Sequence, residues 1–206
     1  EASDSEYLKL EIDGLFGGGL DAGDDNLVLR AARMLSDKGA ALRLRKNLPV
    51  ASGIGGGSAD AAACFRLLSD VWDTDIPPLE QLTELGADVP VCMAQVPMRM
   101  SGIGEKLAPF PAMPKFWILL ANAGHGVETG AVFAAMKARD HAGLSGIPES
   151  FPTAESLFDF LREQRNDMQA AAIEISPVVA DVVGAIKATR NCALSRMSGS
   201  GGTCFG

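Results

Sequence analysis

The sequence predicts an α+β fold in two parts, and three features of the chain lead to that prediction. Short runs in which apolar and polar residues alternate are typical of strands. They stand beside longer runs whose apolar residues recur at helical spacing, without any internal repeat. Pro109, Pro111 and Pro114 crowd one connection between two such mixtures. We therefore expect an N-terminal domain over 1–112 and a C-terminal domain over 113–206.

The first half opens with a predicted strand and a predicted helix. Apolar and polar residues alternate over 7–12, which favours a half-buried strand, and a run of glycines then breaks it. Apolar residues at helical spacing predict a helix over 27–35. We expect Asp24 or Asp25 to cap the start of this helix and Gly39 to end it.

A second strand leads directly into a glycine-rich loop. Leu42 and Leu44 alternate with Arg43 and Arg45, which predicts the strand. After the loop, strong helix formers predict a helix over 59–68. The local order is therefore strand, glycine loop, helix.

The rest of the chain is predicted to be mostly helical. A short helix is expected over 79–85, and a continuous apolar run over 116–120 is typical of a buried strand. Further helices are predicted near 129–138, 154–164, 167–175 and 177–188, and short strands near 193–197 and 203–205.

The composition excludes several classes of protein. A chain of 206 residues with 47% hydrophobic content has enough material for a globular core. Its net charge of -8 predicts no general attraction to nucleic acid or to an anionic membrane. No run of about 18 apolar residues predicts a membrane span. An anionic substrate would need local help from backbone amides or a few cations.

The cysteines and histidines do not form a metal-binding pattern. The four cysteines are widely separated, with no C-x-x-C pair and no His/Cys cluster. Free thiols in a reducing compartment are the simplest interpretation, so we predict a cytoplasmic protein. His125 and His141 lie on predicted loops and receive no role.

The glycine loop carries the strongest chemical signal in the sequence. Gly53, Gly55, Gly56 and Gly57 remove side chains where a backbone would approach a ligand. A helix that begins near Ser58 adds unpaired N–H groups and a positive dipole end, an arrangement that favours phosphate. The Ser58 hydroxyl can contact phosphate or a Mg²⁺-bound water. Spacing alone predicts an anion-binding loop and disfavours a merely flexible turn.

Two familiar phosphate motifs do not fit the chain. The P-loop pattern G-x-x-x-x-G-K-[ST] is absent, and G-x-G-x-x-G counted from Gly53 puts Ser58 in the last place. A second match that starts at Gly17 is not followed by an immediate helix pattern. A dinucleotide-dependent oxidoreductase is therefore disfavoured.

The loop resembles the ATP-binding motif of the GHMP kinases, the superfamily of galactokinase, homoserine kinase and mevalonate kinase. The residues that carry this resemblance, and that are expected to bind ATP, are Pro49, Val50, Ala51, Ser52, Gly53, Ile54, Gly55, Gly56, Gly57, Ser58 and Ala59. Further words narrow the resemblance to the 4-diphosphocytidyl-2-C-methyl-D-erythritol kinase family. They are Asp25-Asn-Leu-Val-Leu-Arg-Ala31, Lys46-Asn-Leu-Pro49, Gly57-Ser-Ala-Asp-Ala-Ala-Ala63, Gly86-Ala-Asp-Val-Pro90, Gly102-Ile-Gly-Glu105, Arg165-Asn-Asp167 and Met197-Ser-Gly-Ser-Gly201.

The resemblance implies a fold and a reaction. The fold is the two-domain GHMP kinase fold, with a ribosomal-protein-S5-like domain followed by a ferredoxin-like α/β domain. The reaction transfers a phosphoryl group from ATP, with Mg²⁺, to the 2-hydroxyl of the methylerythritol part of a cytidine diphosphate conjugate. This step belongs to the non-mevalonate route to isoprenoids. The implied partners are this small-molecule substrate and at most a weak second copy, with no nucleic acid and no membrane.

The resemblance also implies roles for residues outside the loop. Asp88 matches the family's general base, although on sequence alone a helix N-cap before Pro90 is the competing interpretation. Lys46 matches a basic residue near the nucleotide, or else it is an exposed lysine that ends a strand. The stretch from Ser198 to Thr203 resembles the motif that packs beside the phosphate loop, or it is a plain tight turn. Asp60 is interpreted as a first-turn helix acid rather than a metal ligand.

One family motif has no counterpart in the chain. It carries a lysine that works with the aspartate, together with residues that hold the substrate, and Glu1 falls past it. We expect further sequence before Glu1 and after Gly206. A kinase with another small substrate, or a silent binding protein on the same fold, stays an alternative. The metal ligands and the oligomeric state are not assigned.

Overall fold

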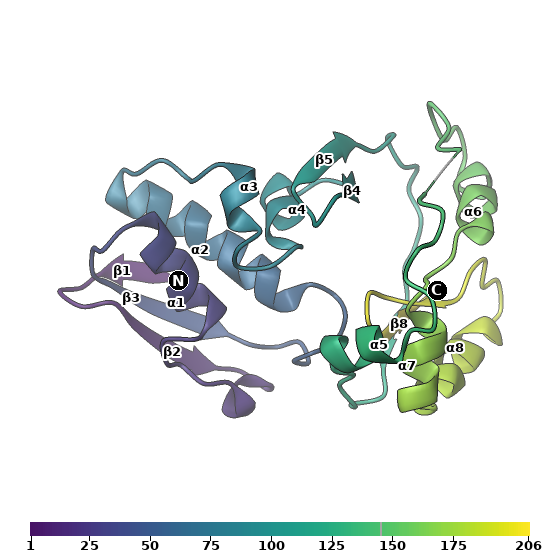
Figure 1. Cartoon of the computed structure of the whole chain (residues 1–206), viewed down its shortest axis with the longest axis horizontal. Helices are drawn as coiled ribbons and strands as arrows, with labels where there is room; N and C mark the ends of the chain where they lie inside the picture. Colours follow the sequence, from purple (N-terminus) through teal and green to yellow (C-terminus); the bar gives the residue numbers. More distant parts are fainter. Residues whose placement is uncertain (145) are drawn as a thin grey trace. The chain divides into compact units, whose positions relative to one another are not determined.

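The computed structural model describes residues 1–144 and 146–206 and divides the chain into two compact units (Figure 1). The first unit comprises Glu1–Val50 and Gly55–Phe110, and the second comprises Ala51–Ile54 and Pro111–Gly206. Four residues of the glycine loop therefore pack with the second unit although they lie within the first in sequence. Within the described residues, no helix is long and apolar enough to cross a membrane.

The first unit combines a small sheet, helices and a hairpin. Its elements are β1 (Ala2–Asp4), β2 (Lys9–Asp13), the 3-10 turn η1 (Gly17–Gly19), α1 (Leu27–Leu35), β3 (Ala40–Arg45), α2 (Gly56–Trp72), α3 (Leu79–Leu82), α4 (Val89–Ala94), β4 (Met98–Ser101) and β5 (Lys106–Pro109). The sheet order is β1-β3-β2, in which β2 runs parallel to β3 and β1 runs antiparallel to it. The strand, glycine loop and helix predicted in the first half are confirmed as β3, the loop and α2.

The core of the first unit lies mainly around α1 and α2. Ala31 and Ala61 are completely buried, and such small side chains let two helices approach closely. Phe65 and Leu68 are also fully buried on the inner face of α2. A methyl group at Gly57 would lie 3.2 Å from Leu27 Cδ1. One glycine of the loop therefore belongs to this helix contact rather than to a ligand site.

The predicted ends of α1 are wrong in detail. Asn26, rather than Asp24 or Asp25, is the N-cap, and its side-chain oxygen accepts from the Val28 N–H at 3.0 Å. The helix ends at Ser36, before Gly39. Gly39 is required for another reason, because any side chain there would collide with the backbone of residues 5–6.

The second unit has a three-stranded antiparallel sheet and helices. Its elements are β6 (Leu120–Asn122), α5 (Thr129–Ala135), α6 (Ala154–Glu163), α7 (Gln169–Ile175), α8 (Val178–Lys187), β7 (Arg196–Met197) and β8 (Thr203–Phe205). The strand order is β6-β8-β7. Its core includes Val132 and Ala172, which are fully buried, and Met197, which is 1% exposed. The helices and short strands predicted after residue 128 are confirmed, within a few residues at their ends.

The buried strand predicted over 116–120 is wrong. Strand β6 begins only at Leu120, and Trp117 is 95% exposed. The N–H and C=O of Leu119 do exchange hydrogen bonds with Gly206, so the pairing extends one residue beyond β6. The side chains on both faces of this run are nevertheless exposed. An apolar run indicates what could be buried, whereas burial depends on a neighbouring layer.

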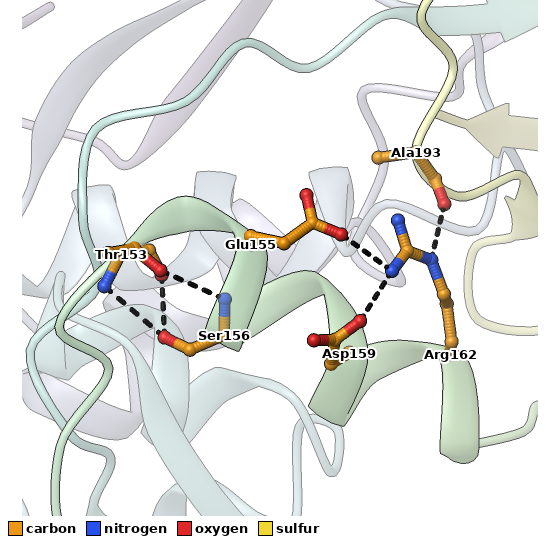
Figure 2. Close-up of polar contacts among 6 residues, drawn as sticks. All are labelled: Thr153, Glu155, Ser156, Asp159, Arg162 and Ala193. Carbon is orange, nitrogen blue, oxygen red and sulfur yellow. Dashed lines mark hydrogen bonds and ion pairs between the residues drawn. The ribbon is translucent and has the colours of Figure 1, made fainter.

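Helix α6 shows how local polar groups determine a helix start (Figure 2). Thr153 and Ser156 form a capping box, in which Thr153 Oγ1 accepts from the Ser156 N–H at 3.2 Å. At the other end, Arg162 donates to Glu155 and Asp159 and, through Nε, to the Ala193 carbonyl at 3.0 Å. The end of α6 is thus attached to the segment that leads into β7.

Candidate active site

The start of α2 has the geometry of an anion site. Gly55 is the N-cap, with a left-handed φ of 68°, and it has no side chain to cap the helix. The first N–H groups of a helix have no partner within it, and the dipole is positive at that end. The nearest atom to a methyl group built on Gly55 would be Asp88 Oδ2, 3.8 Å away. The backbone at this point is therefore open to a ligand.

A buried lysine lies beside this helix start. Lys46 is 7% exposed, and its Nζ donates to Asp60 Oδ2 at 2.5 Å. The same ammonium is 3.2 Å from where a methyl group on Gly56 would be. The exposed-lysine interpretation is therefore wrong, because Lys46 places a positive charge at the first turn of α2. Its partner Asp60 keeps that charge compensated in the folded protein.

The backbone of Lys46 is held by the turn that follows β2. Its N–H donates to the Asp13 carbonyl at 2.7 Å, and its carbonyl accepts from the Phe16 N–H at 2.9 Å. A methyl group on Gly14 would lie 2.5 Å from the Lys46 carbonyl oxygen. These contacts fix the lysine at the point where β3 ends and the glycine loop begins.

Asp88 lies at the N-cap position of α4, but its side chain does not cap that helix. The structure gives it no side-chain hydrogen bond to the first turn, and its φ and ψ of -88° and -7° are helical. Its backbone carbonyl accepts from the Cys92 N–H at 3.1 Å. The carboxylate is exposed and directed to the open side of Gly55. Burial, and after it the charge of Asp88, raises the pKa of the Cys92 thiol.

Two further turns bring Asp88 and Ser58 to the same place. A methyl group on Gly86 would be 3.6 Å from Ser58 Oγ. A side chain on Gly104 would collide with the Ala87 carbonyl, so the β4–β5 turn packs against the residue before Asp88. Glu105 closes that turn by accepting from the Ile103 N–H at 2.7 Å. Backbone hydrogen bonds from Glu105 and Ile103 keep the pKa of the Glu105 carboxyl below its usual value.

The first part of the glycine loop packs against a second glycine turn in the second unit. The Thr203 N–H donates to the Ser52 carbonyl at 2.9 Å, and Ser198 Oγ donates to the Gly53 carbonyl at 2.8 Å. A methyl group on Gly53 would lie 2.5 Å from the carbonyl oxygens of Ser198 and Gly201. These backbones are in contact, so no ligand fits between them.

The structure thus separates the residues that the sequence grouped in one loop. Lys46, Gly55, Gly56, Ser58 and Asp88 surround the start of α2, with Ala59 exposed in its first turn. Ser52 is buried at 4%, and Ala51 has a positive φ of 51°. The remaining loop residues are Pro49, which is half-buried, Val50, which is 42% exposed, Ile54, which is half-buried, and Gly57, which faces Leu27.

Sequence reasoning missed the role of Asp60. It is the ion-pair partner of Lys46, although the two residues are fourteen positions apart. The only available signal was that both belong to the words that carry the family resemblance. Which acid pairs with which base depends on how β3 and α2 pack.

Comparisons with known proteins agree with this geometry. The family model "GHMP kinases N terminal domain" matches residues 26–100. The 4-diphosphocytidyl-2-C-methyl-D-erythritol kinase of Cereibacter sphaeroides is 48% identical, over 100% of this chain and 74% of its own length. The kinase of that name from Paracoccus denitrificans is 50% identical, over 97% of this chain and 70% of its own length.

Solved structures show the same fold. A crystal structure of 4-(cytidine 5'-diphospho)-2C-methyl-D-erythritol kinase matches with a TM-score of 0.72 and 26% identity, over 100% of this chain and 75% of its own. A homoserine kinase from Cytophaga hutchinsonii matches with a TM-score of 0.63 and 13% identity, over 99% of this chain and 73% of its own, which concerns the fold alone. The predicted α+β GHMP kinase fold is confirmed. The chain belongs to the 4-diphosphocytidyl-2-C-methyl-D-erythritol kinase family of the GHMP kinases.

Proposed function

We propose that this chain transfers the γ-phosphoryl group of ATP to the 2-hydroxyl of 4-diphosphocytidyl-2-C-methyl-D-erythritol. The observation that carries the proposal is the position of the Asp88 carboxylate, 3.8 Å from the open side of Gly55 at the start of α2. A base beside a phosphate site is the arrangement that phosphoryl transfer to an alcohol requires. Family membership supplies the substrate class, and it does not favour another small-molecule kinase or a silent binding protein.

The phosphates of ATP are assigned to the glycine loop, Pro49–Ala59, with Lys46. Within that set, the amides at the start of α2 and the Lys46 ammonium provide positive potential at one point. The Ser58 hydroxyl, close to Gly86, adds a donor near the same point. A phosphate at this position would share the Lys46 ammonium with Asp60.

Asp88 is assigned as the residue that accepts the proton of the attacking hydroxyl. Because the carboxylate makes no cap bond to α4, its oxygens are available to a substrate. Phosphoryl transfer depends mainly on positioning and charge stabilisation, so the base needs no strongly basic carboxylate. Its function is to orient the hydroxyl and to remove its proton as the bond to phosphorus forms.

The polar groups at the start of α2 are compatible with Mg²⁺. Among residues 1–144 and 146–206 there is no group of three or more His, Cys, Asp or Glu side chains that could hold a metal. Mg²⁺ in kinases is usually held by one or two protein oxygens together with phosphate oxygens and waters. Ser58 and Asp60 provide such oxygens here. When bound, the ion would neutralise charge on the phosphates.

The assignments of domains and surroundings follow from the same proposal. We assign 1–112 and 113–206 to the N- and C-terminal GHMP kinase domains. The proposed protein acts in the cytoplasm, as a monomer or weak homodimer, without nucleic acid or membrane partners. Its net charge of -8 is consistent with the absence of such partners.

The test replaces Asp88 and follows turnover and ATP binding separately. The chain spans about three quarters of the length of its relatives, so the assay uses the full-length gene product. We expect Asp88→Ala to lower kcat by about 10²–10⁴-fold while ATP affinity changes by less than about threefold, because the base acts on the acceptor rather than on ATP. Coupled detection of ADP measures the rate, and titration calorimetry measures the affinity.

A matched control keeps the kind of substitution and moves it along α2. Asp70→Ala removes an exposed carboxylate near the other end of that helix and should leave both quantities unchanged. A near-normal rate for Asp88→Ala would refute the base assignment. A wild-type enzyme that binds ATP but releases no ADP with the cytidyl alcohol would refute the substrate.

A further inference from the structure

A single amide side chain holds the second glycine turn from behind. Asn166 Nδ2 donates to the Met197 carbonyl at 3.0 Å and to the Gly199 carbonyl at 2.8 Å. Its Oδ1 accepts from the Met168 N–H at 3.0 Å, which ties the side chain to the turn before α7. The two carbonyls that Asn166 binds flank Ser198 on either side.

The turn that Asn166 holds is the one that contacts the phosphate loop. Ser198 donates its hydroxyl to the Gly53 carbonyl at 2.8 Å, and its own N–H donates to the Thr203 carbonyl at 3.0 Å. The Thr203 N–H donates in turn to the Ser52 carbonyl at 2.9 Å. A short chain of hydrogen bonds therefore runs from Asn166 through Ser198 to Gly53.

The neighbouring polar contacts act on a different part of the segment. Arg162 binds the Ala193 carbonyl, as Figure 2 shows, and Arg196 donates to the carbonyls of Leu161 and Gln164 at 2.9 and 2.6 Å. These bonds attach the end of α6 to the residues before and within β7. Asn166 is placed differently, because its two donated bonds lie beyond β7 and on the turn itself.

We infer that Asn166 is a positioning residue for ATP: it fixes the Ser198 turn and, through that turn, the Gly53 end of the phosphate loop. This inference rests on the proposed function, since it takes the loop to be where ATP binds. Its chemistry depends on an amide donor. A carboxylate of the same shape keeps the acceptor for the Met168 N–H but turns two donated bonds into oxygen–oxygen contacts, which repel.

The first test measures ATP affinity in the full-length protein. Asn166→Asp should raise the Kd for ATP roughly tenfold, while kcat at saturating ATP stays within about threefold, because the reacting groups are untouched. Asn191→Asp is the matched control: this exposed residue of the second unit undergoes the same change of amide to carboxylate and should bind ATP like the wild type. Equal ATP affinity in wild type and Asn166→Asp would overturn the inference.

The second test asks whether the effect passes through Ser198. Ser198→Ala removes the hydroxyl bond to Gly53, so in the double variant the loss of ATP affinity should be smaller than the product of the two single losses. Simple multiplication of the two losses would show that Asn166 and Ser198 act independently and would overturn the proposed route.

The third test needs no nucleotide. In ligand-free protein, Asn166→Asp should speed hydrogen exchange about tenfold in the peptide that contains Thr203, whose N–H donates to Ser52, while α8 stays protected. Unchanged exchange at this position would also overturn the inference.

Failure of the proposed function looks different. Wild-type protein that binds ATP without phosphorylating the cytidyl alcohol leaves every Asn166 result readable, because neither ATP titration nor exchange uses the alcohol. Wild-type protein that binds no ATP overturns both the proposed function and the inference.

Discussion

Gly53 and Gly55 lie two residues apart in the glycine loop and have nearly the same φ, 69° and 68°. Their surroundings differ. A methyl group on Gly53 would lie 2.5 Å from two backbone oxygens, whereas one on Gly55 would meet Asp88 Oδ2 at 3.8 Å. The first glycine is required because another backbone packs against it, and the second because a ligand must approach. One residue type in one motif thus serves two physical purposes.

The largest expected effect concerns the packed glycine. Gly53→Ala should lower the free energy of unfolding by about 3 kcal/mol, since left-handed strain and overpacking against backbone each cost roughly 1–3 kcal/mol. Denaturant titration gives the size of the loss. Hydrogen exchange should locate it in the second unit, to which residues 51–54 belong. Unchanged stability would show that the turn around Ser198 can move away, and the packed role of Gly53 would be wrong.

The open glycine should respond in the opposite way. Gly55→Ala should cost only about 1 kcal/mol of stability from left-handed strain, because no atom lies within van der Waals contact of the new methyl group. ATP affinity should fall about tenfold, because the methyl group occupies the approach to the first amides of α2. Titration calorimetry with ATP and denaturant unfolding measure the two quantities. Unchanged ATP affinity would count against the phosphate site at this position.

The smallest effect comes from a glycine with neither constraint. Gly184 is exposed in α8, and a methyl group there would have no described atom within 4 Å. Gly184→Ala should therefore raise the free energy of unfolding by about 0.5–1 kcal/mol, because alanine loses less backbone entropy in a helix. The midpoint of denaturant unfolding should increase while ATP affinity stays constant. A decrease would mean that the losses predicted at Gly53 and Gly55 cannot be attributed to their surroundings alone.

Much of the fold could be predicted because its signals are local. The helical spacing of apolar residues located α1, α6 and α8, and the strand, glycine loop and helix order located the start of α2. The errors concern contacts with distant residues. Gly39 is small because of residues 5–6, and the apolar run at 116–120 is exposed because burial requires a covering layer.

The candidate site was predictable only as a set of residues. Family words indicated Lys46 and Asp88, but each kept a second interpretation that sequence could not remove. Burial of Lys46 against Asp60 excluded the exposed lysine, and the uncapped side chain of Asp88 left its carboxylate available. Asn166 gave no chemical signal in sequence beyond its place in a family word.

The glycine loop shows where the two sources of information divide. The sequence by itself determined the family, the place of the loop and the start of the following helix, because periodicity and the conformational freedom of glycine act over a few residues. Only the tertiary structure decided that Gly53 is packed and Gly55 open. The partners of these two glycines, Ser198 and Asp88, are distant in the chain, and only folding brings them to the loop.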